Sequence, residues 1–285
     1  MWQLDPASKP TALAAFGVLF VLLSPLGARA ATLRVAQGGG GQYQSIAPAI
    51  ADAQDGDVIL VEPGDYVGDL DLMGKELELR STSGPQVTQI LGEVTTLTFV
   101  RGESRQSIID GFTLGGSPLR AMLIRDASPT LTDCIIGDQG SMGYHGTGAF
   151  IMGAGAAPLF DEVTFTGLLA NRGGVYVSSG AQPTFLDPLF EDNQANHGGG
   201  IFAEGGAIVT LSGGRFLGNL SSQGGGGIYL SGASLVASNT LFQANAITST
   251  SAAITVVDRV ARVRRDHQSI VIGSGGPDRR VHSVF

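Results

Sequence analysis

Similar short segments recur along this chain at intervals of about 26 residues. Four of them begin with glycine, "GAFI" at 148, "GVYV" at 174, "GIFA" at 200 and "GIYL" at 227, and a weaker copy, "AITV", follows at 253. A second column holds Phe165, Phe190, Phe216 and Phe242. A third holds "SPTL" at 128, "APLF" at 157, "QPTF" at 182 and "IVTL" at 208. Each unit therefore contains about three short extended segments separated by turn residues.

A unit of this length and composition predicts a coil of a solenoid. The segments are too short and too interrupted by glycine for βαβ units, and no helical heptad is present. Glycine makes up 43 of the 285 residues, about twice its usual share of ~7%, as a turn-dense fold requires. We therefore predict an all-β protein, a single-stranded parallel β-helix with about 26 residues per coil, in which each coil buries its inward side chains against its neighbours.

The beginning of the repeat carries the pattern of a cap. In "SIAPAIADAQ", Ser45 is a candidate N-cap, and apolar residues from Ile46 to Ala53 share one helical face. An uncapped solenoid end would expose unpaired strand edges and apolar side chains. A short N-terminal capping helix is therefore expected.

Two groups of motifs resemble known families. "YQSIAPAIADAQDGDVILVEPGDY" at 43–66 and "SIIDGFTL" at 107–114 resemble the opening of right-handed parallel β-helix proteins of the pectin-lyase-like superfamily. "FEDN", "FLGN" and "FQAN", with "GGGIF" and "GGGIY", resemble the F-x-x-N and G-G-A-I repeats of chlamydial polymorphic outer-membrane proteins. The resemblance covers roughly residues 32–256. It implies a right-handed coil and says little about activity.

Three segments are expected along the chain. Residues 1–30 have the layout of a signal peptide, with Lys9, an apolar run and small residues at Ala28 and Ala30 before a cut. Residues 31–257 form the β-helix domain, with 21 acids against 9 bases, a net charge near −12. Residues 258–285 form a basic, poorly ordered tail. The leader predicts a secreted or cell-surface protein with no membrane span after signal removal. Export with a single cysteine, which allows no internal disulfide, is typical of a bacterial protein.

One column of acids is a candidate site. Asp133, Glu162 and Asp187 fall at the same position of consecutive coils, and stacked coils lie ~4.8 Å apart. Three aligned carboxylates suit calcium binding or acid–base catalysis, and the resemblance implies that superfamily members use aligned aspartates in this way. The column continues as Gly213 and Asn239, however. Asp, Gly and Asn tolerate a left-handed turn, so backbone geometry is the favoured explanation.

A column of asparagines indicates a structural ladder. Asn193, Asn219 and Asn245 recur every 26 residues, and an amide can donate to one coil while accepting from the next. We expect these residues to satisfy turn backbone groups inside the coil. His197 has no second histidine or cysteine at ligand spacing and is expected to be a loop residue.

Aromatic residues supply the strongest indication of binding. If the aliphatic residues of the glycine-led strands point inward, an outward row follows, made of Phe150, Tyr176, Phe202 and Tyr229. Such a row suits contact with sugar rings or with a protein partner. The segment 137–148 lengthens one coil, and its Tyr144 and His145 are further binding candidates.

The functional hypothesis that follows is an exported β-helix protein with a binding or adhesion role and no catalysis. No cofactor is expected, although calcium is a candidate at the acid column. A polysaccharide or a cell-surface protein is the expected partner, and the acidic body argues against nucleic acid. Two alternatives stay open: a lyase or hydrolase acting on acidic polysaccharide through Asp133, Glu162 and Asp187, and a fragment of a longer surface protein.

Overall fold

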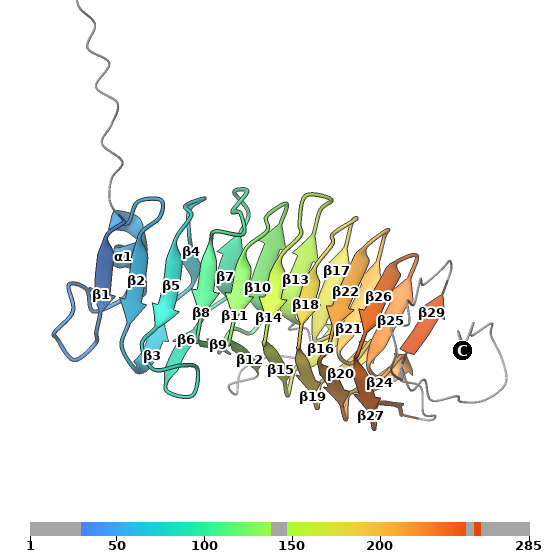
Figure 1. Ribbon diagram of the computed structural model, residues 1–285. Helices are drawn as coiled ribbons and strands as arrows, with labels where there is room; N and C mark the ends of the chain where they lie inside the picture. Colours follow the sequence, from blue (N-terminus) through green and yellow to red (C-terminus); the bar gives the residue numbers. More distant parts are fainter. Residues whose placement is uncertain (1–29, 138–146, 249–253, 258–285) are drawn as a thin grey trace, which may run out of the picture.

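Short strands stack along one axis, so that each sheet takes one strand from successive coils (Figure 1). The computed structural model describes residues 30–137, 147–248 and 254–257. The pairings between described strands are parallel. The predicted parallel β-solenoid, with about 26 residues per coil, is confirmed.

Two long sheets form the upper part of the stack in Figure 1. Sheet A contains, in order, β1 (Thr32–Val35), β2 (Val58–Val61), β5 (Glu78–Ser81), β8 (Ile108–Asp110), β11 (Thr130–Thr132), β14 (Leu159–Asp161), β18 (Thr184–Leu186), β22 (Ile208–Ser212) and β26 (Ser234–Ser238). Sheet C contains β4 (Leu70–Asp71), β7 (Thr95–Phe99), β10 (Arg120–Arg125), β13 (Thr147–Met152), β17 (Val175–Ser178), β21 (Ile201–Glu204), β25 (Ile228–Ser231) and β29 (Ile254–Val257).

Two further sheets close the coil. Sheet B contains β3 (Gly64–Val67), β6 (Thr88–Leu91), β9 (Thr113–Gly115), β12 (Ile135–Gly137), β15 (Thr164–Thr166), β19 (Leu189–Glu191), β23 (Arg215–Leu217) and β27 (Leu241–Gln243). Sheet D contains only β16 (Leu169–Arg172), β20 (Gln194–His197), β24 (Leu220–Gly224) and β28 (Ala246–Ile247). The later coils therefore run through A, B, D and C, one strand more than the three segments that the repeat predicts.

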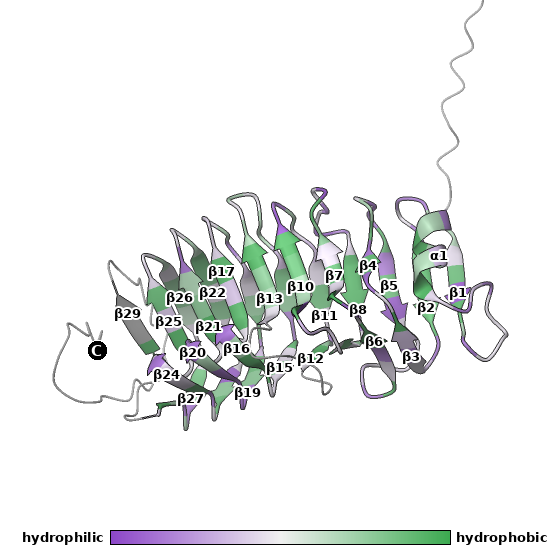
Figure 2. Ribbon diagram, turned by 180° about the vertical axis from the view of Figure 1, so that it is seen from behind, coloured by the Kyte–Doolittle hydropathy of each residue, from purple (hydrophilic) through white to green (hydrophobic). Residues whose placement is uncertain are grey.

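The predicted capping helix lies across the start of the solenoid (Figure 2). It is α1 (Ile46–Asp52), which buries Ile46, Ala49 and Ile50 against the first coils. Ser45 occupies the N-cap position, although its hydroxyl makes no capping hydrogen bond. The Lys75 ammonium lies at the other end of the helix and donates to the carbonyls of Ile50 (2.7 Å) and Ala51 (2.8 Å).

Stacked aromatic rings fill the interior of the later coils. The column Phe165, Phe190, Phe216 and Phe242 forms a continuous stack, with centroids 4.6, 4.4 and 4.7 Å apart. These spacings equal the separation of neighbouring strands, because one ring comes from each coil. The aliphatic residues of the glycine-led strands, including Val175 and Val177, also point inward and are fully buried.

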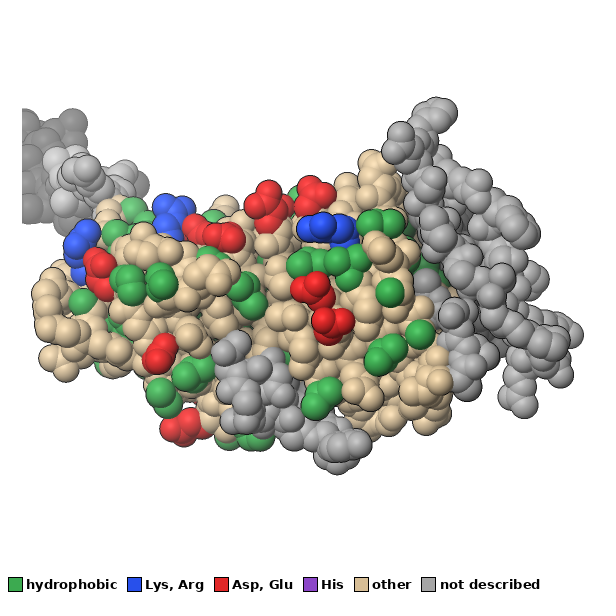
Figure 3. All heavy atoms as spheres, turned by 90° about the horizontal axis from the view of Figure 1, so that it is seen from below, with side chains coloured by type: hydrophobic (Ala, Val, Ile, Leu, Met, Phe, Trp, Pro, Cys, Tyr) green, Lys and Arg blue, Asp and Glu red, His purple; other side chains and the backbone are tan. Residues whose placement is uncertain are grey.

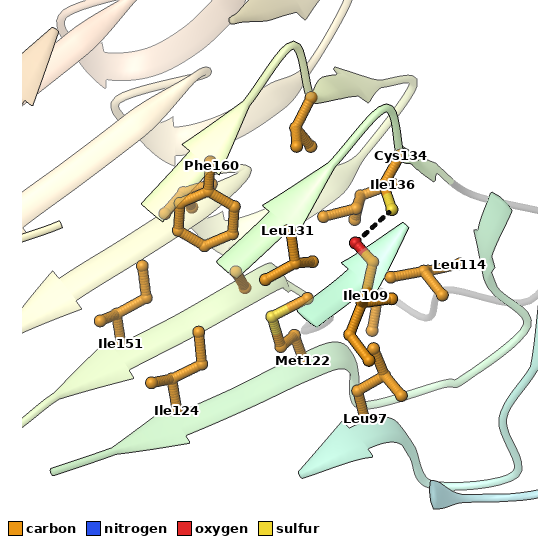
Figure 4. Close-up of a cluster of buried hydrophobic side chains, with 14 of the residues drawn as sticks. Leu97, Ile109, Leu114, Met122, Ile124, Leu131, Cys134, Ile136, Ile151 and Phe160 are labelled. Atoms are coloured by element: carbon orange, nitrogen blue, oxygen red, sulfur yellow. Dashed lines mark hydrogen bonds between the residues drawn. The ribbon is translucent and has the colours of Figure 1, made fainter. Parts of the chain in front are cut away.

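The middle coils bury aliphatic side chains instead. Leu97 of sheet C, Ile109 and Leu131 of sheet A, and Ile136 of sheet B meet at the centre of the coil (Figure 4). The one cysteine, Cys134, is buried beside them, and its thiol donates to the Ile109 carbonyl at 3.7 Å. Burial raises the pKa of this thiol to about 12, so it stays protonated and behaves as a core residue.

Candidate functional site

The three carboxylates of the acid column lie in the turns between sheets A and B. Asp133, Glu162 and Asp187 have φ values of 45°, 53° and 43°, and their side chains are exposed. Gly213 and Asn239, the next two positions of the column, also have positive φ. The shared property of the column is thus a left-handed backbone, including at Glu162. In residues 30–137, 147–248 and 254–257, no group of three acidic, histidine or cysteine side chains lies close enough to hold a metal ion.

The asparagine column lies inside the turns between sheets B and D. Asn193 donates its amide to the Asn219 side-chain oxygen at 2.9 Å, and Asn219 donates to that of Asn245 at 2.8 Å. Each amide also donates to a phenylalanine carbonyl of the preceding coil, at 2.8 to 2.9 Å. Asn193 and Asn219 are fully buried. The sequence "NLS" at 219–221 matches the N-x-S/T pattern for glycosylation, but the buried Asn219 side chain is not accessible for it.

The aromatic row lies on the outer face of sheet C. Phe150, Tyr176, Phe202 and Tyr229 come from β13, β17, β21 and β25 and are directly paired in register. Their ring centroids are 4.7, 5.4 and 5.4 Å apart. Three of the rings are partly exposed, whereas Phe202 is 5% exposed. The row follows the axis of the solenoid across four coils.

The faces of these rings are already occupied. Phe150 and Tyr176 stack with an interplanar angle of 8°, and the Arg120 guanidinium lies 5.5 Å from the Phe150 centroid. The Arg172 guanidinium lies 5.4 Å from Tyr176 and 5.6 Å from Phe202. Between Phe150 and Tyr229, the described contacts therefore leave no open ring face on which a sugar could stack. What the row presents outward is ring edges, which carry the positive part of the aromatic quadrupole.

A polar group covers the middle of the row. Arg172 donates to the Tyr176 hydroxyl at 2.9 Å and to the Glu204 carboxylate at 3.1 Å, and the Tyr176 hydroxyl donates to the same Glu204 oxygen. Burial, with further help from Glu204, raises the pKa of Tyr176, so the phenol stays neutral. The charges of Arg172 and Glu204 thus offset each other at the centre of the row.

His197 lies at the far end of the same group. Its ring contacts Tyr229 edge-on, with centroids 4.8 Å apart, and lies 6.0 Å from Phe202. Burial, and then the positive charge of Arg172, lower the pKa of His197. His197 pairs in register with Arg172, so these two residues occupy one column beside the row.

A hollow of about 260 Å³ opens at the N-terminal end of the row. Its walls include Phe150, Tyr176, Arg172, Arg120 and Asn171. In the described part of the chain Arg120 forms no salt bridge. Its partial burial lowers the pKa of the guanidinium. A guanidinium that has no acidic partner among the described residues and lies at the edge of a hollow suits an anionic ligand group.

Sequence reasoning did not identify Arg120, Arg172 or Glu204. Arg172 and His197 are 25 residues apart and each directly precedes a run of glycines, so the repeat could have shown that they share a column. Arg120 is the first residue of β10, a strand without a leading glycine, and the repeat gave no reason to align it with the row. Tyr144 and His145 lie outside the described residues.

The opposite side of the coil is less suited to binding apolar partners. Seen from below, hydrophobic side chains form separate spots among polar and backbone atoms (Figure 3). Sheets B and D contribute the partly exposed Leu169, Leu220 and Leu241. A second hollow, about 230 Å³, lies over sheet D and is lined by small and polar residues, including Ala170, Gln194 and Asn196.

Comparison with known proteins identifies the fold family. The family described as "Right handed beta helix region" matches residues 120–276. No curated protein sequence matches the chain. Across the described residues, no helix has the length and apolarity to cross a membrane.

Solved structures of pectin methylesterases are similar in fold. One is a pectin methylesterase variant in complex with a hexasaccharide, with TM-score 0.43 and 17% identity over 75% of this chain and 66% of that one. The pectin methylesterase PemA from Erwinia chrysanthemi gives 0.42 and 16% over the same shares. The enzyme from carrot gives 0.42 and 12% over 80% of this chain and 88% of that one. The chain thus spans just under two thirds of the length of the first of these relatives.

Proposed function

This chain belongs to the right-handed parallel β-helix family, the fold that its opening motifs predicted, and from that premise we propose a binding function. The proposed function is that of an exported protein that binds an extended acidic polysaccharide along the outer face of sheet C and does not catalyse its breakdown. The observation that carries the proposal is the aromatic row with Arg120 beside its hollow.

The net charge of the β-helix domain, near −12, repels polyanions in general, but the local chemistry of the row favours an anionic ligand group. Ring faces are occupied, so outward contacts are made by ring edges and by the side chains that flank them. Ring edges attract oxygen atoms that carry negative charge, and guanidinium groups bind carboxylates with two parallel hydrogen bonds. A uronic-acid unit supplies a carboxylate and several hydroxyl oxygens, which match both kinds of contact.

The length of the row favours a polymer. Four coils each contribute one ring at nearly constant spacing, and the hollow at Arg120 lies at one end of this line. A linear chain of like units meets like contacts at each coil, whereas a small molecule uses only one or two of them. Asn171 of sheet D also lines this hollow, and its side-chain oxygen accepts a hydrogen bond from Asn196 of the following coil.

The absence of turnover is proposed from the state of the polar side chains. Arg172, Tyr176 and Glu204 form hydrogen bonds with one another. Because the pKa of the Tyr176 phenol is raised, the phenolate that could act as a base is not formed near neutral pH. The carboxylates of the acid column lie in turns between sheets A and B, away from the face that carries the row. Asp187 therefore has a backbone role in this proposal.

The test is calorimetric titration with polygalacturonate, alginate and neutral dextran. We expect the two acidic polymers to bind, dextran to be inert, and added salt to weaken binding. Arg120→Gln should weaken binding about tenfold, a loss of about 1.4 kcal/mol. Arg215→Gln is the matched control, because Arg215 is an exposed arginine on β23 of sheet B. Equal losses in both variants would show that net charge alone attracts the polymer, which would contradict the proposal.

The enzymatic alternative is tested with the same polymers. Release of unsaturated or reducing ends should stay at the blank level for the parent protein. Turnover that disappears in Asp187→Asn would replace the binding hypothesis with a lyase or hydrolase. Asp187→Asn keeps a residue type that tolerates the left-handed turn, so its stability should change by less than about 0.5 kcal/mol.

A further inference from the structure

The residue just before the first described strand, Ala31, points its backbone nitrogen at a buried carboxylate. The Ala31 N–H donates to Asp57 Oδ1 at 2.7 Å, and the Ala31 carbonyl accepts from the Val58 N–H at 2.9 Å. Ala31 directly precedes β1, which pairs with β2 along its whole length. The backbone N–H and the carbonyl of Ala31 are therefore hydrogen-bonded to Asp57 and Val58, respectively, where the chain enters β2.

Asp57 is a charged side chain in an unusually closed position. It is 6% exposed, and its second oxygen accepts from the Gln54 N–H at 2.8 Å. In the described part of the chain no arginine, lysine or histidine forms a salt bridge with it. Two neutral amides are its partners, and a buried carboxylate without a countercharge is costly.

The charged groups on the surrounding elements are engaged elsewhere. Asp55 in the same turn accepts from the Glu76 N–H, and Asp52 of α1 accepts from the Tyr43 hydroxyl. Arg34 of β1 pairs with Glu62, Arg80 of β5 pairs with Glu78 and Asp110, and Lys75 caps α1. None of these cations supplies the missing charge at Asp57.

The sequence just before Ala31 suggests where that charge comes from. Ala28 and Ala30 occupy the small-residue positions that precede the cut in a signal peptide, and this pattern predicts a cut between Ala30 and Ala31. We propose that the Ala30–Ala31 bond is the processing site of this protein, and that the α-ammonium released at Ala31 forms an ion pair with Asp57 that anchors β1.

The chemistry of the step is a peptide hydrolysis by a leader peptidase. Water breaks the C–N bond, its hydroxyl passes to the Ala30 carbonyl carbon, and a proton passes to the Ala31 nitrogen. The Ala30 carboxyl then ionises, and its proton completes the Ala31 ammonium at neutral pH. The nitrogen that gave Asp57 one neutral N–H now gives it a positive charge, and charge-assisted hydrogen bonds are about twice as strong as neutral ones.

The first experiment establishes the processing site. The full-length chain is exported from a bacterial host, and the product is examined by N-terminal sequencing and intact mass. We expect Ala31 as the first residue. A product that begins elsewhere would overturn the proposal.

The second experiment measures the ion pair at the amine itself. Only the unprotonated amine reacts with an acylating reagent, so the pH dependence of acylation gives the α-amino pKa, ordinarily ~7.7–8.0. In the mature chain Asp57 should raise this pKa, so that acylation at pH 8 is about tenfold slower than in Asp57→Asn. Asp55→Asn is the matched control, since Asp55 is exposed and in the same turn, and its rate should equal that of the parent. Equal rates in the parent and Asp57→Asn would overturn the proposal.

A third measurement removes the amine and keeps Asp57. It therefore does not depend on whether the Asp57→Asn variant folds normally. A chain that begins at Ala30 again has a neutral amide at Ala31. Because the amine pKa is raised on folding, the extra stability of the Ala31 form is present below about pH 8 and is lost as pH rises through the folded value. We expect a higher thermal midpoint for the Ala31 form at pH 6 and equal midpoints at pH 10. Equal midpoints at both pH values would overturn the proposal.

Discussion

Asn219 is the residue whose substitution should remove several buried hydrogen bonds at once. Its amide donates to the Phe190 carbonyl and to Asn245, and its oxygen accepts from the backbone and side chain of Asn193. Asn219→Ala leaves several buried groups without partners, each worth about 1–3 kcal/mol. We expect the free energy of unfolding to fall by about 3 kcal/mol or more, as measured by chemical denaturation.

The matched control is another asparagine from the same part of the coil. Asn196 donates to Asn171 in the preceding coil and accepts from Ser222 in the following coil, but its side chain is exposed to solvent. Asn196→Ala should change the free energy of unfolding by less than about 0.5 kcal/mol. A small effect at Asn219 would mean that water replaces the lost amide, and the column would then not be a structural ladder.

His197 gives a pH-dependent prediction at the same scale. Burial and Arg172 lower its pKa below the ordinary ~6.5, so folding favours the neutral imidazole. The unfolded chain binds the proton more readily, and stability should decline as pH falls below about 6.5. An NMR titration of the His197 ring should give a midpoint below 6.5. In Arg172→Gln the midpoint should rise but stay below the ordinary value, because burial remains.

How far a residue's role can be predicted from the sequence depends on what fixes it. The column positions of Phe150, Tyr176 and Asn193 follow from counting along the repeat, because stacking converts a fixed interval into contact. The occupied ring faces do not follow from counting. Arg172 reaches Tyr176 and Phe202 through a long side chain from a neighbouring sheet, and no periodicity marks such a contact.

At the scale of elements, helix α1 offers a direct test of capping. The Lys75 ammonium binds the carbonyls of Ile50 and Ala51, which have no partner within the helix. Lys75→Met should lower the free energy of unfolding by about 1–2 kcal/mol, since hydrogen bonds to charged groups are worth about 1.5–3 kcal/mol. Thermal denaturation followed by circular dichroism measures the loss.

A surface salt bridge is the control for that measurement. Arg34 pairs with Glu62 at 3.6 Å, and its side chain is 58% exposed. Arg34→Met should cost less than about 1 kcal/mol. If Lys75→Met costs no more than Arg34→Met, the helix end is solvated and the lysine does not act as a cap.

Sheet D is the element that the sequence did not predict. Its strands, "LANR", "QANH", "LSSQG" and "AI", place Leu169, Gln194, Leu220 and Ala246 in one outward column, so polar and apolar residues mix. The inward positions hold small residues such as Ala195 and Ser221. Strand prediction from sequence relies on a regular alternation of apolar and polar residues, and neither face of this sheet supplies one. Sheets A, B and C were predictable because their inward columns are mostly apolar and alternate with outward polar or partly exposed residues.

At the scale of the whole molecule, the two ends of the described solenoid are built differently. Helix α1, Lys75 and Asp57 hold the first coils through polar contacts specific to that end. The later coils repeat the same asparagine and phenylalanine contacts from one coil to the next. Each coil contacts only its neighbours. The free energy of unfolding should therefore be a sum of contributions from single coils and from the interfaces between adjacent coils.

Hydrogen exchange measured by mass spectrometry tests this one-dimensional coupling. Asn219→Ala should speed exchange most in β19, β20, β27 and β28, whose turns contain the bonded partners Asn193 and Asn245, and least in β2 and β5. Ile50→Ala removes a buried side chain from α1 and should show the reverse pattern, with β1 and β2 losing protection first. The two variants act as controls for each other, since each leaves the far end intact. Equal loss of protection along the whole chain in both would mean that the coils open as a single unit, and local columns would then not govern stability.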